Sequence, residues 1–321
     1  MKILVLGAGG IGGYFGVRLH EAGGDVGFLV RPARAALLQE KGLQVSSPRG
    51  DAHVFPRIVT DIEPGDQYDV IFLSCKAYDL ASALDAIAPA VGAQSIIVPL
   101  LNGLFHLDVL DARFGRDAVQ GGLAHLAVTL TPTGEIRHLN QSNRFVLGAR
   151  SDQQSPWLEA LARLLSHSSV EFQLSADIEQ DMWDKFVFLS ALAAATCTMR
   201  ASVGDILATT AGPDFIQGLF LECTKVASAH QHAPNPDKIG SYLTQLTDPG
   251  SLLTASMLRD IERGGPTESD HILGDMIRRG ESKGVNVPLL KLAYSHLEAY
   301  ELRRSRDIAR AAAAQQCSLL G

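Results

Sequence analysis

The sequence is poor in cysteine and carries no excess of positive charge. Its 321 residues include only 4 cysteines, and these form no Cys-x-x-Cys pair or other spacing typical of metal ligands: Cys75, Cys197, Cys223 and Cys317. A disulfide framework and a zinc site are therefore not expected, and the thiols are predicted to be reduced and mostly buried. The formal net charge of −7 argues against nucleic acid or an anionic membrane as the main partner.

Long uncharged apolar runs are also missing. No run reaches the length needed to cross a membrane. The N-terminus has no basic region followed by an apolar leader, because it is itself the first predicted strand. We therefore expect a cytoplasmic protein. At 321 residues, 46% of them hydrophobic, the chain is long enough for two domains and a sizeable core.

The most informative feature that is present is a glycine motif at the end of the first predicted strand. Lys2–Leu6 lead directly into Gly7-Ala8-Gly9-Gly10-Ile11-Gly12, the pattern Gly-x-Gly-x-x-Gly. Gly7 permits a tight turn, Gly9 lets the backbone approach a pyrophosphate, and Gly12 lets the next helix pack closely on the sheet. The N-terminus of that helix, predicted over Tyr14–Glu21, favours a phosphate. The pattern alone is weak, but between a strand and a helix it predicts a bound dinucleotide.

The end of the second predicted strand, Asp25–Arg31, indicates which dinucleotide binds. An NAD site places Asp or Glu about 20 residues after the glycines, on the ribose 2′-hydroxyl. This chain has Arg31 there, followed by Arg34. A guanidinium accommodates a 2′-phosphate, which a carboxylate would repel. The alternative is a pair of surface arginines in a loop; the sequence favours NADP(H).

Strand and helix patterns alternate through the first half of the chain. Asp69–Ser74 and Ser95–Leu101 are short, nearly continuous apolar runs, as expected of strands buried on both faces of a parallel sheet. The alanine-rich segment Leu80–Ala90 is the predicted crossover helix between them. Further strands are expected at the far side of the same sheet, over residues 118–130, 134–139 and 144–147.

Helical periodicity replaces the strand pattern from about Asp177 onward. We therefore predict an α/β fold: an N-terminal Rossmann-type dinucleotide-binding domain over residues 1–170, followed by an all-α domain over residues 171–321. The transition is expected near residues 168–176. The alanine- and glutamine-rich residues 309–321 are predicted to form a frayed tail.

Three polar residues accompany the later strands of the predicted sheet. Ligands of open α/β sheets bind beyond the carboxyl ends of the strands. Lys76 and Asn102 stand there, after the second and third apolar runs. Both are candidate site residues, with the capping of a turn as the alternative. His125 lies within a predicted strand and is expected simply to face outward.

The helical half contains one unusual charge. Lys185 precedes Phe186–Met199, a stretch without any charge that must be buried nearly all round. The lysine amine is therefore predicted at the rim of an apolar cavity. Burial lowers the pKa of a lysine and a nearby anion restores the protonated form, which suits a group that polarises and protonates a carbonyl. A lysine that snorkels into water is the equal alternative.

Two later segments carry weaker candidates. A helix is predicted over Ser251–Arg263, where Ser256 is more simply an ordinary helix residue. The next helix is predicted to begin with a capping box formed by Thr267 and Asp270. Glu268 in its first turn has an ordinary explanation, because acids favour helix N-termini.

Together these segments resemble the ketopantoate reductases, also called 2-dehydropantoate 2-reductases. The matching motifs are, in order, the glycine motif with Arg31, Cys75-Lys76-Ala77, Leu101-Asn102-Gly103, Trp183-x-Lys185-Phe186, Ala255-Ser256-Met257-Leu258-x-Asp260 and Pro266-Thr267-Glu268. They cover nearly the whole chain. The resemblance implies a Rossmann-type domain, a helical domain and an active site in the cleft between them. It also implies NADPH-dependent reduction of 2-dehydropantoate to pantoate, a step toward pantothenate.

The resemblance further implies roles for single residues. It makes Lys185 and Glu268 catalytic, with Lys185 stabilising and protonating the ketone oxygen. The implied substrate-binding set is Asn102, Lys185, Ser256 and Glu268, and the implied NADP(H)-binding set is Gly7, Ala8, Gly9, Gly10, Ile11, Gly12, Arg31, Lys76 and Asn102. No metal is required, and the partner is a small 2-oxo acid. Because dimers are common in the family, a homodimer is a candidate assembly.

Two positions depart from the family pattern. Many members carry asparagines one and two helical turns after the catalytic lysine, where this chain has Leu189 and Ala193; Ser190 and Thr196 are the nearest polar residues. Fewer polar partners weaken the binding of a substrate hydroxyl. A reductase of a bulkier or more apolar 2-oxo acid is therefore a second hypothesis, and a non-catalytic dinucleotide sensor is a third.

Overall fold

A computed structural model describes residues 1–152 and 155–318, with side chains up to residue 313. The chain divides into two compact units. The first comprises Met1–Asn102 and His106–Met182; the second comprises Gly103–Phe105 and the chain from Trp183 onward. The division thus falls inside helix α6 (Ile178–Met199), later than the transition expected near residues 168–176. The fold class is as predicted, with a Rossmann-like α/β unit followed by a helical one.

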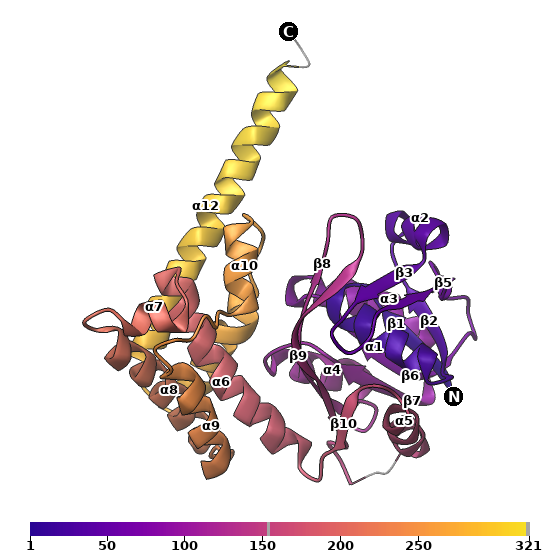
Figure 1. Cartoon of the computed structure of the whole chain (residues 1–321), viewed down its shortest axis with the longest axis horizontal. Helices are drawn as coiled ribbons and strands as arrows, with labels where there is room; N and C mark the ends of the chain where they lie inside the picture. The colour runs from indigo at the N-terminus through magenta and orange to yellow at the C-terminus, as the bar shows by residue number, and fades with distance from the viewer. Residues whose placement is uncertain (153–154, 319–321) are drawn as a thin grey trace. The chain divides into compact units, whose positions relative to one another are not determined.

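The first unit is built on a parallel sheet of five strands (Figure 1). Their order is β5 (Arg57–Val59), β2 (Asp25–Leu29), β1 (Lys2–Leu6), β6 (Tyr68–Leu73) and β7 (Val91–Pro99). The chain leaves the central strand β1 toward β2 on one side and continues on the other side with β6. The strand order therefore reverses between β1 and β6, and in such sheets ligands bind at that point, beyond the carboxyl ends of the strands.

Helices connect the strands of this unit and complete its core. They are α1 (Gly10–Glu21), α2 (Pro32–Lys41), α3 (Leu80–Ile87), α4 (Phe105–Phe114) and α5 (Pro156–Ser166), with short 3₁₀ turns η1 (Ala77–Asp79) and η2 (Ala88–Ala90) around α3. The core between α1 and the sheets is aromatic. The rings of Phe15 and Phe145 lie 5.1 Å apart, and Tyr14, Phe28 and Phe72 are fully buried with them.

The prediction that the later strands extend the same sheet is wrong. They form a second sheet, with the order β10 (Glu171–Leu174), β9 (Ile136–Gly148), β3 (Leu43–Ser46) and β4 (Ala52–Val54), and with β8 (Gly121–Leu130) paired to β9. The two segments predicted at 134–139 and 144–147 are one continuous strand, β9, which forms a long antiparallel hairpin with β8 (Figure 1).

The first sheet stops at β7 for a local reason. Pro99 ends that strand and has no N–H to donate to a further partner. Beyond β7 the chain makes an isolated parallel bridge, Ile97 with Val119. The following residues then pair with β9 instead. His125, on β8, is half-buried rather than turned fully outward.

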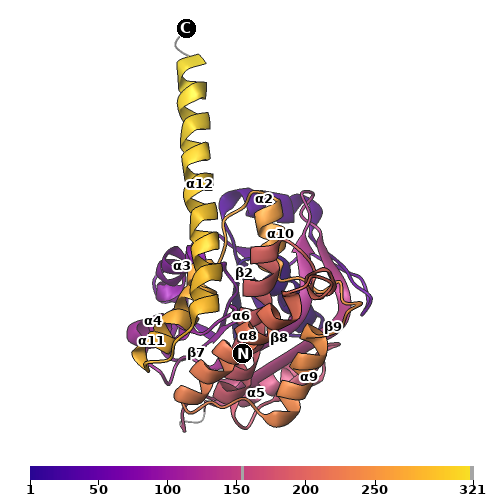
Figure 2. The same ribbon diagram turned by 90° about the vertical axis from the view of Figure 1, so that its left-hand side faces the viewer.

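The second unit is helical throughout its described part. After α6 come α7 (Val203–Leu207), α8 (Gly212–Ala229), α9 (Pro236–Leu246), α10 (Ser256–Glu262), the π-helix η3 (Asp270–Gly274), α11 (Asp275–Ser282) and α12 (Pro288–Ser318). Within this unit α12 runs well past the other helices (Figures 1 and 2). The predicted frayed tail is therefore wrong as far as Ser318, and the last three residues lie outside the described part of the chain.

Two helix starts differ from the predictions. The helix expected from Ser251 begins at Ser256, because the backbone of residues 251–253 is used elsewhere: the carbonyls of Ser251 and Leu253 accept from Gly204 and Val203. The capping box of Thr267 and Asp270 is also wrong. The Thr267 hydroxyl donates to Ser269 instead, and the helix beyond it starts as a π-helix.

The three cysteines whose side chains are described agree with the expectation of reduced, mostly buried thiols. Cys197 and Cys223 are buried, Cys75 is half-buried, and all three are free thiols. The side chain of Cys317 lies outside the described residues. Burial raises the pKa of the Cys197 thiol to about 12, so this group stays protonated and unreactive near neutral pH.

Candidate functional site

The turn between β1 and α1 has the geometry that a dinucleotide needs. Gly7 has φ = +88°, a conformation that side-chain-bearing residues rarely adopt, and its N–H donates to Leu29 at 2.9 Å. Gly9 is the N-cap of α1 and brings no side chain to the unpaired N–H groups of the first helical turn. A Cβ added at Gly9 would meet no atom of the described residues within 4 Å. This position is therefore open space beside a helix N-terminus, the arrangement that binds a phosphate.

Gly12 has a different reason to be glycine. A Cβ there would lie 2.7 Å from the carbonyl oxygen of Gly7 and would also collide with the Ser74 hydroxyl. Ser74 Oγ is not free to move aside, because it donates to the carbonyl of Leu6 at 2.8 Å. The start of α1, the glycine turn and the end of β6 are thus packed backbone against backbone.

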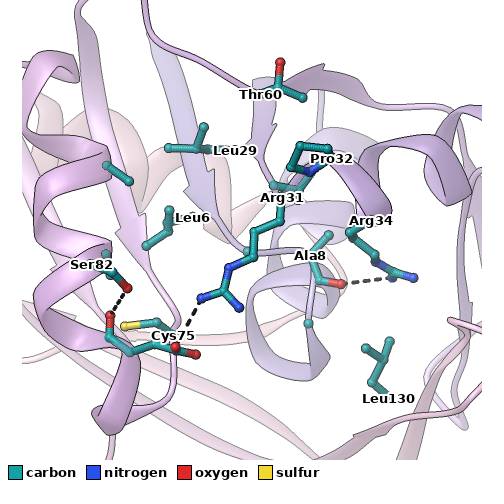
Figure 3. Close-up of a pocket in the computed structure, with 16 residues that line it drawn as sticks. Leu6, Ala8, Leu29, Arg31, Pro32, Arg34, Thr60, Cys75, Ser82 and Leu130 are labelled. Atoms are coloured by element: carbon teal, nitrogen blue, oxygen red, sulfur yellow. Dashed lines mark hydrogen bonds and ion pairs between the residues drawn. The ribbon is translucent and has the colours of Figure 1, made fainter. Parts of the chain in front are cut away.

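A pocket of about 520 Å³ opens beside this turn (Figure 3). Residues from the ends of β1, β2 and β6 and from α3 form its wall: Leu6, Gly7, Ala8, Gly9, Leu29, Val30, Arg31, Pro32, Arg34, Thr60, Cys75, Asp79, Ser82, Ala83, Ala86 and Leu130. It is mostly apolar, with a few polar groups that could orient a nucleotide. Of the predicted cofactor-binding residues, the lining contains Gly7, Ala8, Gly9 and Arg31. The residues of that set that do not line it are Gly10, Ile11, Gly12, Lys76 and Asn102.

The two arginines at the end of β2 have different surroundings. Arg31 is the N-cap residue of α2 and is 78% exposed; its guanidinium reaches Asp79 at 3.1 Å (Figure 3). Arg34 donates to the carbonyls of Ala8 and Gly134 at 2.9 and 3.0 Å, and burial lowers its pKa. Arg34 therefore fastens the glycine turn to the β8–β9 loop, whereas the guanidinium of Arg31 is exposed in the pocket and paired only with the partly exposed Asp79 among the contacts described.

Lys76 and Asn102 lie at the carboxyl ends of β6 and β7, as predicted. Both are half-buried. Lys76 is the N-cap residue of η1, and its carbonyl accepts from the N–H of Asp79 at 2.9 Å. Asn102 is the last residue before the short segment Gly103–Phe105 that belongs to the second unit. The aromatic ring of Phe105 packs edge-on against His271 of η3, with ring centres 5.7 Å apart.

Lys185 occupies the second turn of α6. It is half-buried, its neighbours Trp183, Asp184 and Phe186 are buried, and this burial lowers the pKa of the lysine to about 8. The helix is held here by stacking: the Trp183 ring lies 5.4 Å from His230 and 5.4 Å from His232. The amine is therefore carried by a packed helix and keeps its proton more weakly than an ordinary lysine.

Ser256 begins α10 and is exposed. The residue before it is tied to α6, since the N–H of Ala255 donates to the buried Thr196 hydroxyl at 3.2 Å. Thr196 itself donates to the carbonyl of Leu192 at 2.7 Å. One buried hydroxyl thus positions the start of the helix that carries Ser256 against the helix that carries Lys185.

Glu268 is buried, with 8% of its surface exposed, in a segment without regular secondary structure between α10 and η3. Three residues of α12 hold this segment: Tyr300 donates to Gly265 at 2.8 Å, Arg304 donates to Gly264 at 2.8 Å, and Glu301 accepts from the N–H of Thr267 at 2.6 Å. The π-helix that follows is a rare element often found at functional sites.

The second unit therefore carries Lys185, Ser256 and Glu268, while the glycine turn, Arg31, Lys76 and Asn102 belong to the first. The positions that depart from the family pattern, Leu189 and Ala193, are half-buried and buried on α6. Asp79 lines the pocket but is not among the site residues predicted from the sequence. The rule that selected Lys76, that ligands bind beyond the carboxyl ends of the strands, applies to Asp79 as well.

Residues 1–152 and 155–318 contain no group of three or more His, Cys, Asp or Glu side chains that could hold a metal ion. In that part of the chain no helix is both long and apolar enough to span a bilayer.

Both units match models of known protein families. Residues 3–152 match the family described as ketopantoate reductase PanE/ApbA, and residues 177–301 match its C-terminal counterpart. An uncharacterized oxidoreductase of Bacillus subtilis (strain 168), YkpB, is 36% identical over 304 residues, which cover 95% of this chain and 100% of that protein. A 2-dehydropantoate 2-reductase of Mesorhizobium japonicum is 28% identical over 294 residues, covering 85% of this chain and 89% of that protein.

Solved structures agree with this placement. The 2-dehydropantoate 2-reductase of Methylococcus capsulatus has a TM-score of 0.84 at 28% identity, covering 95% of this chain and 98% of that one. A D-mandelate dehydrogenase, solved with NADH and anilino(oxo)acetate, has a TM-score of 0.85 at 25% identity, covering 95% and 100%. The chain belongs to the ketopantoate reductase family of oxidoreductases.

Proposed function

We propose that this protein is an NADPH-dependent reductase of 2-oxo acids, with 2-dehydropantoate as the first candidate substrate and pantoate as its product. The observation that carries the proposal is Lys185, a half-buried lysine on the buried helix α6 whose pKa is lowered to about 8. A general acid works best when its pKa lies near the operating pH. The family resemblance supports the choice of substrate class.

The cofactor, when bound, supplies the hydride that reduces the ketone carbon. The glycine turn and the N-terminus of α1 fit its pyrophosphate, because Gly9 leaves open space there. Lys185 then stabilises the negative charge that develops on the ketone oxygen and donates the proton to it. Glu268 keeps the lysine charged or orients the substrate hydroxyl, and Ser256 and Asn102 hold the substrate carboxylate side in place.

The preference for NADPH is assigned to Arg31. Replacing Arg31 by alanine removes a guanidinium that would pair with the 2′-phosphate, so the dissociation constant for NADPH is expected to rise by about tenfold or more. The constant for NADH should change little, because NADH has no 2′-phosphate. Fluorescence titration of the protein with each nucleotide measures both values. Equal losses for NADPH and NADH would count against 2′-phosphate recognition.

The lowered pKa of Lys185 predicts the pH dependence of the reduction. In the free enzyme the ammonium loses its proton as the pH rises through about 8, so kcat/KM should fall above that value. A bound carboxylate substrate favours the protonated lysine, so the corresponding fall in kcat should lie at higher pH. Initial rates measured across the pH range test this, and a kcat/KM that stays level up to about pH 10 would contradict the assignment.

A second candidate substrate is a more apolar 2-oxo acid. Leu189 and Ala193 put apolar side chains one and two turns beyond Lys185, where a polar substrate end would lack partners. The similarity to a D-mandelate dehydrogenase solved with anilino(oxo)acetate, an aryl-substituted oxo acid, favours the same reading.

Steady-state kinetics with a panel of 2-oxo acids decides between the candidates. The panel pairs 2-dehydropantoate with branched aliphatic and aryl 2-oxo acids, with NADPH and NADH as alternative donors. The first candidate predicts by far the highest kcat/KM for 2-dehydropantoate. A higher value for an aryl or aliphatic acid selects the second, and turnover of none of them would refute the proposed reaction.

A further inference from the structure

The dinucleotide pocket contains a carboxylate as well as a guanidinium. Arg31 comes from the end of β2, and Asp79 comes from η1, after β6, so the two approach from neighbouring strand ends. Their charged atoms, Nη2 of Arg31 and Oδ1 of Asp79, lie 3.1 Å apart. Both side chains line the pocket, and both are exposed to solvent in part. Water therefore screens this ion pair, and a stronger ligand can break it.

The carboxylate of Asp79 is not used to cap the helix that it precedes. Asp79 is the N-cap residue of α3, where aspartate commonly accepts a hydrogen bond from the first helical turn. Among the described residues, however, its carboxylate makes no such capping bond. Its backbone carbonyl instead accepts from the Ser82 hydroxyl at 2.9 Å, which holds the turn while the carboxylate faces Arg31.

The two charges favour different cofactors. In dinucleotide sites an acidic side chain from the end of the second strand accepts a hydrogen bond from the ribose 2′-hydroxyl of NADH, whereas an arginine accommodates the 2′-phosphate of NADPH. Here the arginine holds that strand end, and Asp79 brings a carboxylate into the same pocket from η1. A 2′-phosphate must take Arg31 from Asp79 and then sit beside a carboxylate of like charge. NADH binding requires neither change. Each nucleotide therefore meets one favourable group, and the carboxylate opposes only NADPH.

We propose that Asp79 is a specificity-determining residue that reduces the preference of this pocket for NADPH, so that the enzyme uses NADH as well. This inference rests on the proposed function of the pocket as a dinucleotide site. Asp79 competes with the 2′-phosphate for Arg31 and serves as the acceptor for a free 2′-hydroxyl.

The experiment measures dissociation constants for NADPH and NADH by fluorescence titration of the full chain, without substrate. Asp79→Asn and Asp79→Ala are each expected to tighten NADPH binding roughly fivefold, the effect of an exposed charge pair. Asp79→Ala is also expected to weaken NADH binding, because the 2′-hydroxyl loses its acceptor. In an Arg31→Ala background, Asp79→Asn should lose most of its effect on NADPH if the carboxylate acts by occupying Arg31.

Asp85→Asn is the matched control. Asp85 lies on α3 and pairs with Arg113 at 2.7 Å, so this change removes the same charge outside the residues that line the pocket. An NADPH-to-NADH ratio unchanged by Asp79→Asn, or changed equally by Asp85→Asn, would overturn the inference while leaving the proposed function standing. A wild-type protein that binds neither nucleotide would refute the proposed function, and the inference with it.

Discussion

Replacing Lys185 by alanine is expected to lower kcat for 2-oxo acid reduction at least about a hundredfold, the scale of a lost general acid. The ammonium would stabilise the alkoxide as it forms and also supply its proton, so its removal affects both charge and proton transfer. The dissociation constant for NADPH should stay nearly unchanged, because the glycine turn and Arg31 belong to the other unit of the chain. Stopped-flow or steady-state rates, with nucleotide titration of the same preparation, give both quantities.

Two further variants make this result interpretable. Lys185→Arg keeps the charge but has a side chain that does not give up its proton near neutral pH, so it should remain slow and should lose the fall in rate near pH 8. Lys225→Ala removes an exposed lysine from α8 and should behave as wild type. A wild-type rate in Lys185→Ala would refute the role given to Lys185. A wild-type protein that binds NADPH but reduces no 2-oxo acid would instead support the non-catalytic sensor.

The cofactor half of the site could be predicted from the sequence because it depends on local rules. A glycine at position 7 follows from the backbone of one turn, and Arg31 follows from its distance along the chain after that turn. Lys185 could be singled out because it is the last charge before a long apolar stretch of one helix. Each of these signals is local, lying within one helix or within the first β-α-β unit of the chain.

Other parts of the site depend on contacts between distant segments. Arg34 looks equivalent to Arg31 in the sequence, but the carbonyl of Gly134, 100 positions away, gives it a structural role. Asp79 looks like a helix cap until its partner is known. The segment that carries Glu268 is held by α12, more than thirty positions later, so the predicted capping box could not have revealed it.

The same limit explains the error in the sheet. The residue pattern predicted β8 and most of β9 as strands, but such a pattern does not indicate which other strand each one pairs with. The strands β3 and β10, which pair with β9 in parallel, are short, and β4 joins the sheet only through β3. The one local sign that the first sheet would end at β7 is Pro99, which has no backbone N–H to donate to a further strand.

A buried carboxylate in the helical unit also has a role that depends on a contact between distant segments. Glu222 of α8 accepts from the N–H groups of Leu289 and Leu290 at 3.0 and 2.9 Å, and so caps the N-terminus of α12. A capping acid is normally the residue immediately before the helix that it caps. Here it comes from another helix, and no spacing within α12 could indicate it.

The glycine motif allows its two functions, packing and ligand binding, to be separated by substitution. Gly12→Ala is expected to destabilise the fold by about 3 kcal/mol, because the new Cβ would press on the Gly7 carbonyl, 2.7 Å away, and backbone atoms cannot rotate aside. The shift of α1 that relieves this contact also moves its N-terminus away from the pyrophosphate, so NADPH binding should weaken more than about tenfold. Thermal unfolding and nucleotide titration measure the two losses.

Gly9→Ala is the matched comparison, because the added methyl group enters open space in the protein. The backbone at Gly9, with φ = −86° and ψ = −164°, is extended and accessible to alanine, so the unfolding temperature should stay close to that of wild type. NADPH binding should nevertheless weaken, because the methyl group occupies the approach of the pyrophosphate to the helix N-terminus. If Gly9→Ala bound NADPH as tightly as wild type, the pyrophosphate could not lie against this turn. If Gly12→Ala were as stable as wild type, the close packing of α1 on β6 would not be the reason for its glycine.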